Sequence, residues 1–444
     1  MPRKLLITSI ALLCSGGLLA QPKTPSAPST QPPAHTIGPN PQLAKPNKQT
    51  IPTVHIAPAK GWPEGTGPTA ASGLSVAALA TGLDHPRWIY VLPNGDVLVA
   101  ETNAPLKPED GKGIKGAVMG AVMKRAGATA PTANRITLLR DVDGDGVAEL
   151  RTTFLQGLNS PFGMALIGNN FYVANSDAIV RFPYVAGQAQ ITAAPTKIFD
   201  LPAGPINRHW TKNIIASADG SKLYATVGSN SNVAENGMPA EEGRAAIWEF
   251  DIATGKGRLF ATGLRNPNGM AWAGGKLWTV VNERDEIGND LVPDYLTSVT
   301  DGAFYGWPYS YYGANVDVRV KPPVPAMVAK AVKPDYSLGS HVAPLGLTSS
   351  EGAALPAPFN AGFFIGQHGS WNRKPRSGYN VVFVPYDGKA MPMAQPVVVL
   401  SGFVNADGDA YGRPVGVAID KRGGLLVADD VGNVIWRVTS ASAR

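Results

Sequence analysis

Histidine and arginine recur at comparable places in this chain, each just before a short apolar segment. These places hold His85, Ser160, His209, the pair Arg265-Asn266, His341 and Arg413. A neutral imidazole, with an ordinary pKa of about 6.5, can accept a proton near pH 7. A guanidinium group binds carboxylates and stabilises negative charge as it develops. These residue types therefore predict proton transfer beside an anionic group, if the fold brings the positions together.

The segments that carry these residues are copies of one phrase. Each copy has a Gly-Leu or Arg-Pro approach, a short apolar strand, a turn such as Asn94-Gly95 or Gly423-Gly424, and a second strand. The six copies occupy residues 82–103, 157–176, 208–232, 263–286, 344–372 and 412–438. A long repeat with several strands is typical of propeller blades. We therefore predict an all-β fold, a six-bladed β-propeller over residues 70–444, with few helices.

This architecture tells where function should lie. The inner strands of a propeller line its central channel, and the loops that enter them crowd one face. The histidines and arginines before those strands should therefore converge on that face. Two stacked β-sandwiches, the alternative fold, would explain the strands but not the period.

Composition and charge exclude several classes of protein. The chain has 444 residues with 50 Gly, 39 Pro and only 16% charged residues, which disfavours coiled coils and long helices. A single Cys excludes a disulfide scaffold. The net charge is +6, but residues 1–69 hold six basic side chains and one acidic side chain, which leaves +1 for the body. The high pI thus belongs to the N-terminal part, and we expect no nucleic-acid partner.

The N-terminal residues predict export. Arg3-Lys4, the apolar run 5–13 and small residues up to Ala20 are typical of a signal peptide over residues 1–20. We expect a periplasmic or secreted protein rather than one anchored by a lipid on Cys14, because Leu13 is bulky where a small residue is preferred. The run is too short for a membrane span. Residues 21–69 contain 12 prolines and predict a disordered linker.

Several stretches resemble a known family. They are RHWTKNIIASADGSKLYATVGSNSN (208–232), GLRNPNGMAW (263–272), the run from Asn282 to Gly313, QHGSWNR (367–373) and GRPVGVA (412–418). The chain resembles the quinoprotein soluble aldose-sugar dehydrogenases, in particular the sorbosone dehydrogenase-like branch. The resemblance extends over nearly all of residues 74–440.

The resemblance implies a six-bladed propeller that binds pyrroloquinoline quinone and calcium and oxidises a sugar hydroxyl, hemiacetal or aldehyde. It makes His209 the general base that takes the substrate proton while hydride goes to the quinone. Arg265 and Asn266 would face the quinone carbonyls, and Arg413 would hold a cofactor carboxylate. Where the glucose-oxidising relatives carry an aspartate in the strand after the histidine, this chain has Ser229.

Further site residues follow from the same resemblance. The cofactor lysine of the relatives has no match near residues 367–373, so His368 or Arg373 would replace it, and His341 would complete the cofactor site. Calcium prefers oxygen ligands. The loop after the fourth repeat offers the oxygens of Glu283, Arg284 (through its carbonyl), Asn289 and Asp290.

A separate motif alternates carboxylates around glycine. Asp141, Asp143 and Asp145 are spaced like the first half of a calcium-binding loop, without the distant glutamate that would complete it. The two interpretations are a structural calcium site and a solvated acidic turn.

Two other functions compete with the dehydrogenase: a propeller lactonase that needs calcium but no quinone, and a propeller that only binds a ligand or a protein. A lactonase would want a carboxylate-rich metal centre on the channel axis, whereas the positions before the strands are rich in His and Arg. The sequence has no Cys-x-x-Cys-His and no Gly-x-Gly-x-x-Gly after a strand, so we expect neither covalent haem nor nicotinamide. Electrons would then leave to a separate acceptor, a cytochrome or a quinone.

Overall fold

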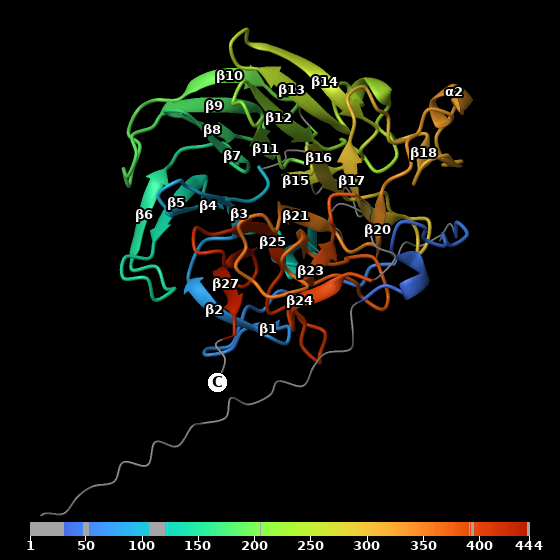
Figure 1. Ribbon diagram of the computed structural model, residues 1–444. Coiled ribbons are helices and arrows are strands. Elements are labelled where there is room, and N and C mark those ends of the chain that lie inside the picture. Colours follow the sequence, from blue (N-terminus) through green and yellow to red (C-terminus); the bar gives the residue numbers. More distant parts are fainter. Residues whose placement is uncertain are drawn as a thin grey trace, which may run out of the picture.

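The computed structural model describes residues 31–47, 53–105, 120–121, 123–204, 206–389, 391 and 395–441. These residues form six antiparallel sheets of four or five strands around a central axis (Figure 1). The predicted six-bladed β-propeller is thereby confirmed, and the two-sandwich alternative is wrong. Within these ranges, no helix has the length and apolarity that crossing a membrane requires. The predicted signal peptide, with Cys14, lies outside the described residues.

The blades follow one another along the chain. Blade 1 consists of β3 (Pro86–Val91), β4 (Val97–Glu101), β5 (Arg135–Arg140) and β6 (Leu150–Leu155). Blade 2 consists of β7 (Met164–Ile167), β8 (Asn170–Ala174), β9 (Ala178–Pro183) and β10 (Thr196–Asp200). Blade 3 consists of β11 (Ile214–Ala216), β12 (Lys222–Val227), β13 (Ala246–Asp251) and β14 (Lys256–Thr262).

The second half of the ring has the same plan. Blade 4 consists of β15 (Pro267–Ala273), β16 (Lys276–Val281), β17 (Pro293–Val299) and β20 (Tyr336–Ser340). Blade 5 consists of β21 (Pro344–Ser349), β22 (Gly362–Gln367), β23 (Asn380–Pro385), β24 (Val397–Ser401) and the short β1 (Thr69–Ala70). Blade 6 consists of β25 (Pro414–Ile419), β26 (Leu425–Asp429), β27 (Val434–Ser440) and β2 (Leu74–Ala80). The smaller elements are η1 (Ala34–Thr36), η2 (Met238–Glu241), α2 (Pro325–Val328), β18 (Ser310–Tyr311) and β19 (Asn315–Val316).

The ring is closed by backbone hydrogen bonds between the two ends of the propeller. Strand β2 pairs antiparallel with β27, in a register that sets Leu74 opposite Ser440, and so supplies the outermost strand of blade 6. In the same way β1 pairs with β24 of blade 5, with Thr69 opposite Ser401. The N-terminal strands therefore tie the last two blades to the start of the chain.

The glycine that recurs in the repeated phrase lies where the inner strands approach one another. A Cβ atom on Gly346 of β21 would lie 2.1 Å from the carbonyl oxygen of Val415 in β25. A Cβ atom on Gly163, just before β7, would lie 2.3 Å from the backbone nitrogen of Ile214. Only glycine allows backbones to approach this closely. The repeated phrase thus determines how closely the inner strands pack around the axis, as well as where the hairpins turn.

Within the predicted disordered linker over residues 21–69, the described parts 31–47 and 53–68 pack against the propeller, contrary to the prediction, while residues 21–30 and 48–52 lie outside the described residues. The Asn47 amide donates to the Ile287 carbonyl (2.9 Å), and the His55 amide donates to the Trp371 carbonyl (2.8 Å). The Trp62 indole donates to the Asp429 carboxylate (2.7 Å). Proline removes backbone donors but does not prevent a segment from pairing through its other residues. The described parts, 31–47 and 53–68, thus cover part of the propeller surface.

We predict that Gly346→Ala destabilises the propeller, because the new methyl group would push β21 away from β25. Overpacking of this kind costs about 1–3 kcal/mol, and urea unfolding would measure the loss. The matched control is Ser349→Ala at the half-buried last residue of the same strand. It should change the free energy of unfolding by less than about 0.5 kcal/mol. Equal effects of the two substitutions would contradict this account of the axis.

Candidate functional site

The residues predicted to converge lie before the starts of the inner strands β3, β7, β11, β15, β21 and β25; they are His85, Ser160, His209, Arg265-Asn266, His341 and Arg413. The other predicted cofactor and metal residues follow second strands: Glu283, Arg284, Asn289 and Asp290 come after β16, and His368 and Arg373 come after β22. Contacts between blades join these ends. The guanidinium of Arg87 lies 5.7 Å from the ring centroid of Trp210, and the Asn213 side-chain amide donates to the Asn268 carbonyl (3.1 Å). Asn282 donates in turn to the carbonyl of Pro344 (2.7 Å). The side chains form two groups, which meet at the dipeptide His209-Trp210.

The first group is organised by the carboxylate of Asp285. Arg265 lies 3.4 Å from it, His341 Nδ1 lies 3.3 Å from it, and the Asn372 side-chain amide donates to it (2.8 Å). Burial alone would raise the pKa of Asp285, but the His341 hydrogen bond and the Arg265 charge lower this pKa to about 2. The other ring nitrogen of His341 contacts the Gly288 carbonyl (3.0 Å). Both contacts favour a protonated ring, and although burial opposes it, the pKa of His341 is raised.

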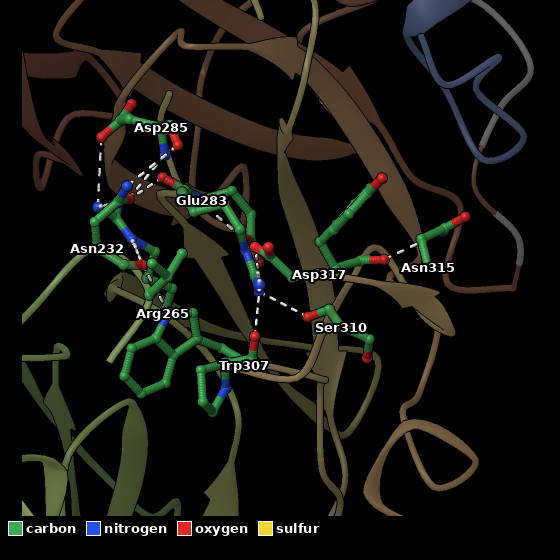
Figure 2. Close-up of polar contacts among 12 residues, drawn as sticks. Asn232, Arg265, Glu283, Asp285, Trp307, Ser310, Asn315 and Asp317 are labelled. Carbon is green, nitrogen blue, oxygen red and sulfur yellow. Dashed lines mark hydrogen bonds and ion pairs between the residues drawn. The ribbon is translucent and has the colours of Figure 1, made fainter. Parts of the chain in front are cut away.

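Asn232 fixes the orientation of Arg265 (Figure 2). Its side-chain oxygen accepts from Arg265 Nη2 (3.0 Å) and from the Asp285 backbone amide (2.9 Å). Its backbone carbonyl accepts from Arg265 Nε (3.3 Å) and from the Trp307 indole (3.0 Å). Arg265 Nη1 donates to the Glu283 carbonyl (2.6 Å). The cation is therefore held from three sides before any ligand binds.

His209 is held as a neutral base. Its Nδ1 lies 2.7 Å from the carbonyl oxygen of Ser229 and 3.1 Å from the Ser229 hydroxyl, which itself donates to Ser231. A carbonyl can only accept, so Nδ1 carries the proton and Nε2 keeps its lone pair. Burial, and then the charge of Arg265, lower the pKa of His209 to about 3. Ser229, which stands where the relatives have an aspartate, thus orients the ring without adding charge.

Gly228 allows His209 and Asn266 to lie close together. A Cβ atom at this position would lie 2.3 Å from Asn266 Oδ1 and 2.5 Å from His209 Cβ. Asn266 Oδ1 is buried and has no hydrogen-bond partner among the described residues. An unsatisfied buried amide oxygen is costly, which suggests a ligand as its partner.

The second group surrounds the buried carboxylate of Asp430. Arg87 donates to it (2.7 Å), His368 Nε2 lies 2.8 Å from it, and His85 Nε2 lies 3.5 Å from it. Although burial would raise the pKa of Asp430, the two histidines and Arg87 hold it far below the ordinary value. Burial, the largest cause in each case, lowers the pKa of His85 to about 4 and also lowers that of His368.

Arg413 completes this group. Its Nη2 donates to the Ala57 carbonyl of the N-terminal segment (3.1 Å), and its guanidinium lies 5.0 Å from the ring centroid of Tyr379. Its Nε and that of Arg87 are buried and make no hydrogen bond within the described chain. Each group thus combines one carboxylate with two cationic side chains, counting His341, and leaves an excess of positive charge.

Arg373 and two of the predicted calcium ligands have ion-pair partners within the protein. Arg373 Nη2 pairs with Asp290 (2.7 Å), and Arg373 Nε donates to the Asn289 carbonyl (3.0 Å), so its guanidinium is engaged by the loop after β16. Glu283 pairs with the side chain of Arg284 (3.0 Å). Two of the four predicted ligands, Glu283 and Asp290, thus already have cationic partners, and the calcium site formed by Glu283, Arg284, Asn289 and Asp290 stays a prediction.

The salt bridge between Glu283 and Arg284 belongs to a larger set of polar contacts that includes Asp317 and Ser310, which Figure 2 labels. Arg284 lies 3.2 Å from the Asp317 carboxylate and donates to the Ser310 carbonyl (2.7 Å). The Arg284 side chain is fully buried, and Glu283 Oε1 has no hydrogen-bond partner in the described structure. A buried guanidinium needs such anionic partners.

The acidic loop between β5 and β6 lies apart from both groups. The side-chain oxygens of Asp141, Asp143, Asp145 and Glu149 lie within 4.8 Å of one another. No other set of three or more His, Cys, Asp or Glu in the described ranges is gathered this closely. Glu149, which the sequence analysis did not assign to this site, joins the three aspartates, and Arg422 offsets part of their charge by pairing with Asp141 (2.8 Å). The structural calcium stays a prediction.

Several functional side chains were missed by the sequence analysis. They are Arg87, Trp210, Asn232, Asp285 and Asp430. Asn232, Asp285 and Asp430 follow the second strand of a blade. In an antiparallel hairpin the end of the second strand lies beside the start of the first. The polar residues after each second strand were therefore the signal that could have found them.

Comparison with known proteins agrees with this geometry. The sequence profile of the TrAA12-like family matches residues 131–297 and 327–441, and the glucose / sorbosone dehydrogenase profile matches residues 249–369. A protein from Borreliella burgdorferi is 27% identical over 297 residues, which are 64% of this chain and 77% of that protein. A pyrroloquinoline quinone-dependent pyranose dehydrogenase from Coprinopsis cinerea is 24% identical, with 84% of this chain and 54% of that enzyme matched. The chain thus spans about half the length of the pyranose dehydrogenase.

Solved structures share the propeller. A Trichoderma reesei protein of Carbohydrate-Active Enzymes Family AA12 superposes with a TM-score of 0.67 at 19% identity, over 88% of this chain and 100% of that one. The holo form of the pyranose dehydrogenase PQQ domain from Coprinopsis cinerea superposes with a TM-score of 0.64 at 22% identity, over 87% and 100%. At these identities the structures show a common fold. Because its profile matches most of the propeller, the chain belongs to the TrAA12-like family, which confirms the predicted kinship with the quinoprotein sugar dehydrogenases.

Proposed function

We propose that this protein is an exported, periplasmic sugar dehydrogenase that uses pyrroloquinoline quinone. It oxidises a sugar hydroxyl or hemiacetal of the aldose or pyranose type, or a sugar aldehyde such as sorbosone, to the corresponding carbonyl or acid. The observation that carries the proposal is a neutral, oriented His209 beside Arg265, with surplus positive charge on both sides. The quinone-bearing relatives in the same family support the choice of cofactor.

The residues present fit an anionic, tricarboxylate cofactor. The unpaired Nε–H groups of Arg87 and Arg413 and the surplus charge around Asp285 and Asp430 would be satisfied by carboxylates. Arg413, Arg87 and His368 would hold cofactor carboxylates, and Arg265 with Asn266 would face the reactive carbonyls. When bound, the quinone supplies the acceptor for the hydride that leaves the substrate carbon.

The residues of this chain then handle the proton and the charge. His209 Nε2 takes the hydroxyl proton of the sugar, and the Ser229 carbonyl keeps the ring in the required tautomer. Arg265, already fixed by Asn232 and Asp285, stabilises the negative charge that develops opposite the base. Because these partners are preorganised, they need not reorient during the reaction.

Two alternatives remain to be separated, a lactonase and a non-catalytic binding propeller. A lactonase would need a metal centre at the channel, whereas the carboxylates Asp285 and Asp430 are engaged by cationic side chains. Neither alternative explains why a neutral histidine with a free Nε2 lies beside Arg265.

The function is tested by titrating the purified protein with pyrroloquinoline quinone and following dye reduction over a panel of aldoses and sorbosone. We expect activity only after quinone is added, with bleaching of the quinone absorbance by sugar. Parallel titrations with Ca²⁺ and with EDTA test the predicted calcium requirement, which the paired Glu283 and Asp290 do not support. Sugar oxidation in the absence of quinone, or hydrolysis of a lactone by the protein, would contradict the proposal.

We predict that His209→Gln lowers kcat by at least about a hundredfold, since a general base contributes about 10²–10⁴-fold. Quinone affinity and the melting temperature should change little. The matched control is His35→Gln, at an exposed histidine of η1, which should keep normal turnover. A lower melting temperature with near-normal kcat would instead make His209 a packing residue.

The role of Ser229 predicts a pH effect of known sign. In the wild type the lowered pKa of His209 keeps the base neutral well below pH 6.5, so kcat/KM should persist into acid. In Ser229→Asp a carboxylate beside Nδ1 favours the imidazolium form, so the pKa of His209 rises. As the pH is lowered, the loss of kcat/KM should therefore begin at a higher pH than in the wild type. Ser229→Asn, which adds no charge, is the control. Identical acid limbs for the Asp and Asn variants would exclude His209 as the titrating base.

We predict that Arg413→Ala weakens quinone binding about tenfold or more, because a hydrogen bond to a charged group contributes about 1.5–3 kcal/mol. Arg413→Lys keeps the charge but loses the forked donors and should rescue binding only in part. Fluorescence titration with quinone measures the change. An unchanged binding curve for Arg413→Ala would remove this residue from the cofactor site.

A further inference from the structure

One stretch of the N-terminal segment, residues 53–62, contacts the loops on the side of the propeller that carries the candidate site. The His55 amide donates to the carbonyl of Trp371, which follows β22 of blade 5 (2.8 Å). The Ala59 amide donates to the carbonyl of Arg125, between β4 and β5 of blade 1 (2.9 Å). Both acceptors follow the second strand of a blade, at the end where the inner strands begin. We call residues 53–62 the strap.

Blade 6 lies between blades 5 and 1 in the ring, and there the strap contacts Arg413 directly. The buried guanidinium of Arg413 donates from Nη2 to the Ala57 carbonyl of the strap (3.1 Å), and its other face lies near the ring of Tyr379. Its Nε has no hydrogen-bond partner among the described residues. The strap carbonyl thus fixes one edge of the guanidinium and leaves a donor for a ligand.

The strap also supports the backbone of Arg413, through Trp62. The Trp62 indole donates to Asp429 Oδ2 (2.7 Å), and Asp429 Oδ1 accepts from the Arg413 backbone amide (2.7 Å). The same carboxylate accepts from the Trp436 indole (3.1 Å) and the Gly432 amide (2.8 Å). Burial raises the pKa of Asp429 to about 6, and of the hydrogen bonds that oppose burial the one from Trp62 lowers this pKa most. Trp62 therefore helps to keep the carboxylate that holds Arg413 ionised.

Blade 6 is shaped to receive the Trp62 indole and the Asp429 carboxylate. A Cβ atom on Gly412 would lie 2.1 Å from Asp429 Oδ2, and one on Gly432 would lie 2.6 Å from Trp62 Cδ1. Only glycine leaves this space for the two side chains. The Trp62 ring also packs edge-on against Phe403, with the ring centroids 5.5 Å apart. Close packing thus holds the strap in one position on blade 6.

We propose that the strap is part of the quinone site and that Trp62 is a positioning residue for Arg413. The proposal rests on the proposed function, in which Arg413 holds a cofactor carboxylate. The strap fixes Arg413 at both ends, its backbone through Trp62 and Asp429 and its guanidinium through the Ala57 carbonyl. A cation oriented in advance loses less conformational freedom when the ligand binds. Quinone binding and ordering of the strap therefore stabilise each other.

The first test is Trp62→Phe, which keeps an aromatic ring and loses the indole N–H. We expect it to weaken binding of pyrroloquinoline quinone about three- to tenfold, because the lost hydrogen bond to a charged group acts on the cofactor only through Arg413. Calorimetric titration of the purified apoprotein measures this affinity without turnover.

The matched control is Trp272→Phe. The half-buried Trp272 of blade 4 donates an indole hydrogen bond of the same length, 2.7 Å, to the Ala216 carbonyl of blade 3. This variant should bind quinone like the wild type. Melting temperatures of both variants are measured beside the affinities, so that a general loss of stability is separated from a loss of binding.

The second test needs no substitution. Hydrogen–deuterium exchange of the wild type is compared with and without quinone at the Lys60 amide, which donates to the Ala410 carbonyl (2.8 Å), and at the Ala410 amide, which donates to the Pro58 carbonyl (2.7 Å). We expect quinone to slow exchange there at least about threefold, since a ligand that binds the ordered strap stabilises it by mass action. The amides of Asp420 and Gly424, in the turn at the other end of blade 6, should be slowed less.

Three outcomes would overturn the proposal: Trp62→Phe that binds quinone as tightly as the wild type, an equal loss of affinity in Trp272→Phe, or equal slowing of exchange in the strap and in the far turn. In each of them the wild type still binds quinone, so the proposed function stands and only the role of the strap is refuted. A wild type that binds no quinone would refute the proposed function, and the role of the strap with it.

Discussion

A carboxylate shared among neighbouring blades is the constraint on which the candidate site depends. Asp285 of blade 4 is in contact with Arg265 of the same blade, with His341 and Asn372 of blade 5, and through its backbone with Asn232 of blade 3. A cation held by one carboxylate alone would be neutralised. Asp285 is shared by Arg265 and His341, and Asp430 is shared by Arg87 and two histidines. The Nε atoms of Arg87 and Arg413 stay without a hydrogen-bond partner among the described residues, so the site keeps donors for an anionic ligand.

This arrangement also separates the protonation states of the histidines. His341 lies against a carboxylate and has a raised pKa, whereas His209 faces a carbonyl and a neighbouring cation and has a lowered pKa. The same residue type thus has a raised pKa before blade 5 and a lowered pKa before blade 3. Which histidine plays which part is decided by the group opposite Nδ1, Asp285 or Ser229, and not by the position of the histidine in the repeat.

The repeat was enough to predict the six blades and the convergence of the residues before the inner strands, because hairpin turns and alternating apolar residues are local signals. The partners of those residues are not local. Arg373 turns to Asp290 and Glu283 to Arg284, and these pairings depend on neighbouring side chains that a motif does not record. The packing of the N-terminal segment could not be predicted either. Its proline content suggests a linker, while Trp62 and the carbonyl of Ala57 provide contacts to Asp429 and Arg413.

The closure of the ring by β2 has a consequence for how the protein is made. Blade 6 needs β2 from near the start of the chain and β25, β26 and β27 from its end, so it cannot form until the ribosome has passed residue 440. Arg413 and Asp430 belong to this last blade. A nascent or prematurely terminated chain would therefore present His209 and Arg265 without the opposite half of the charged site. The charged site is therefore complete only in a chain that has been translated to its last blade.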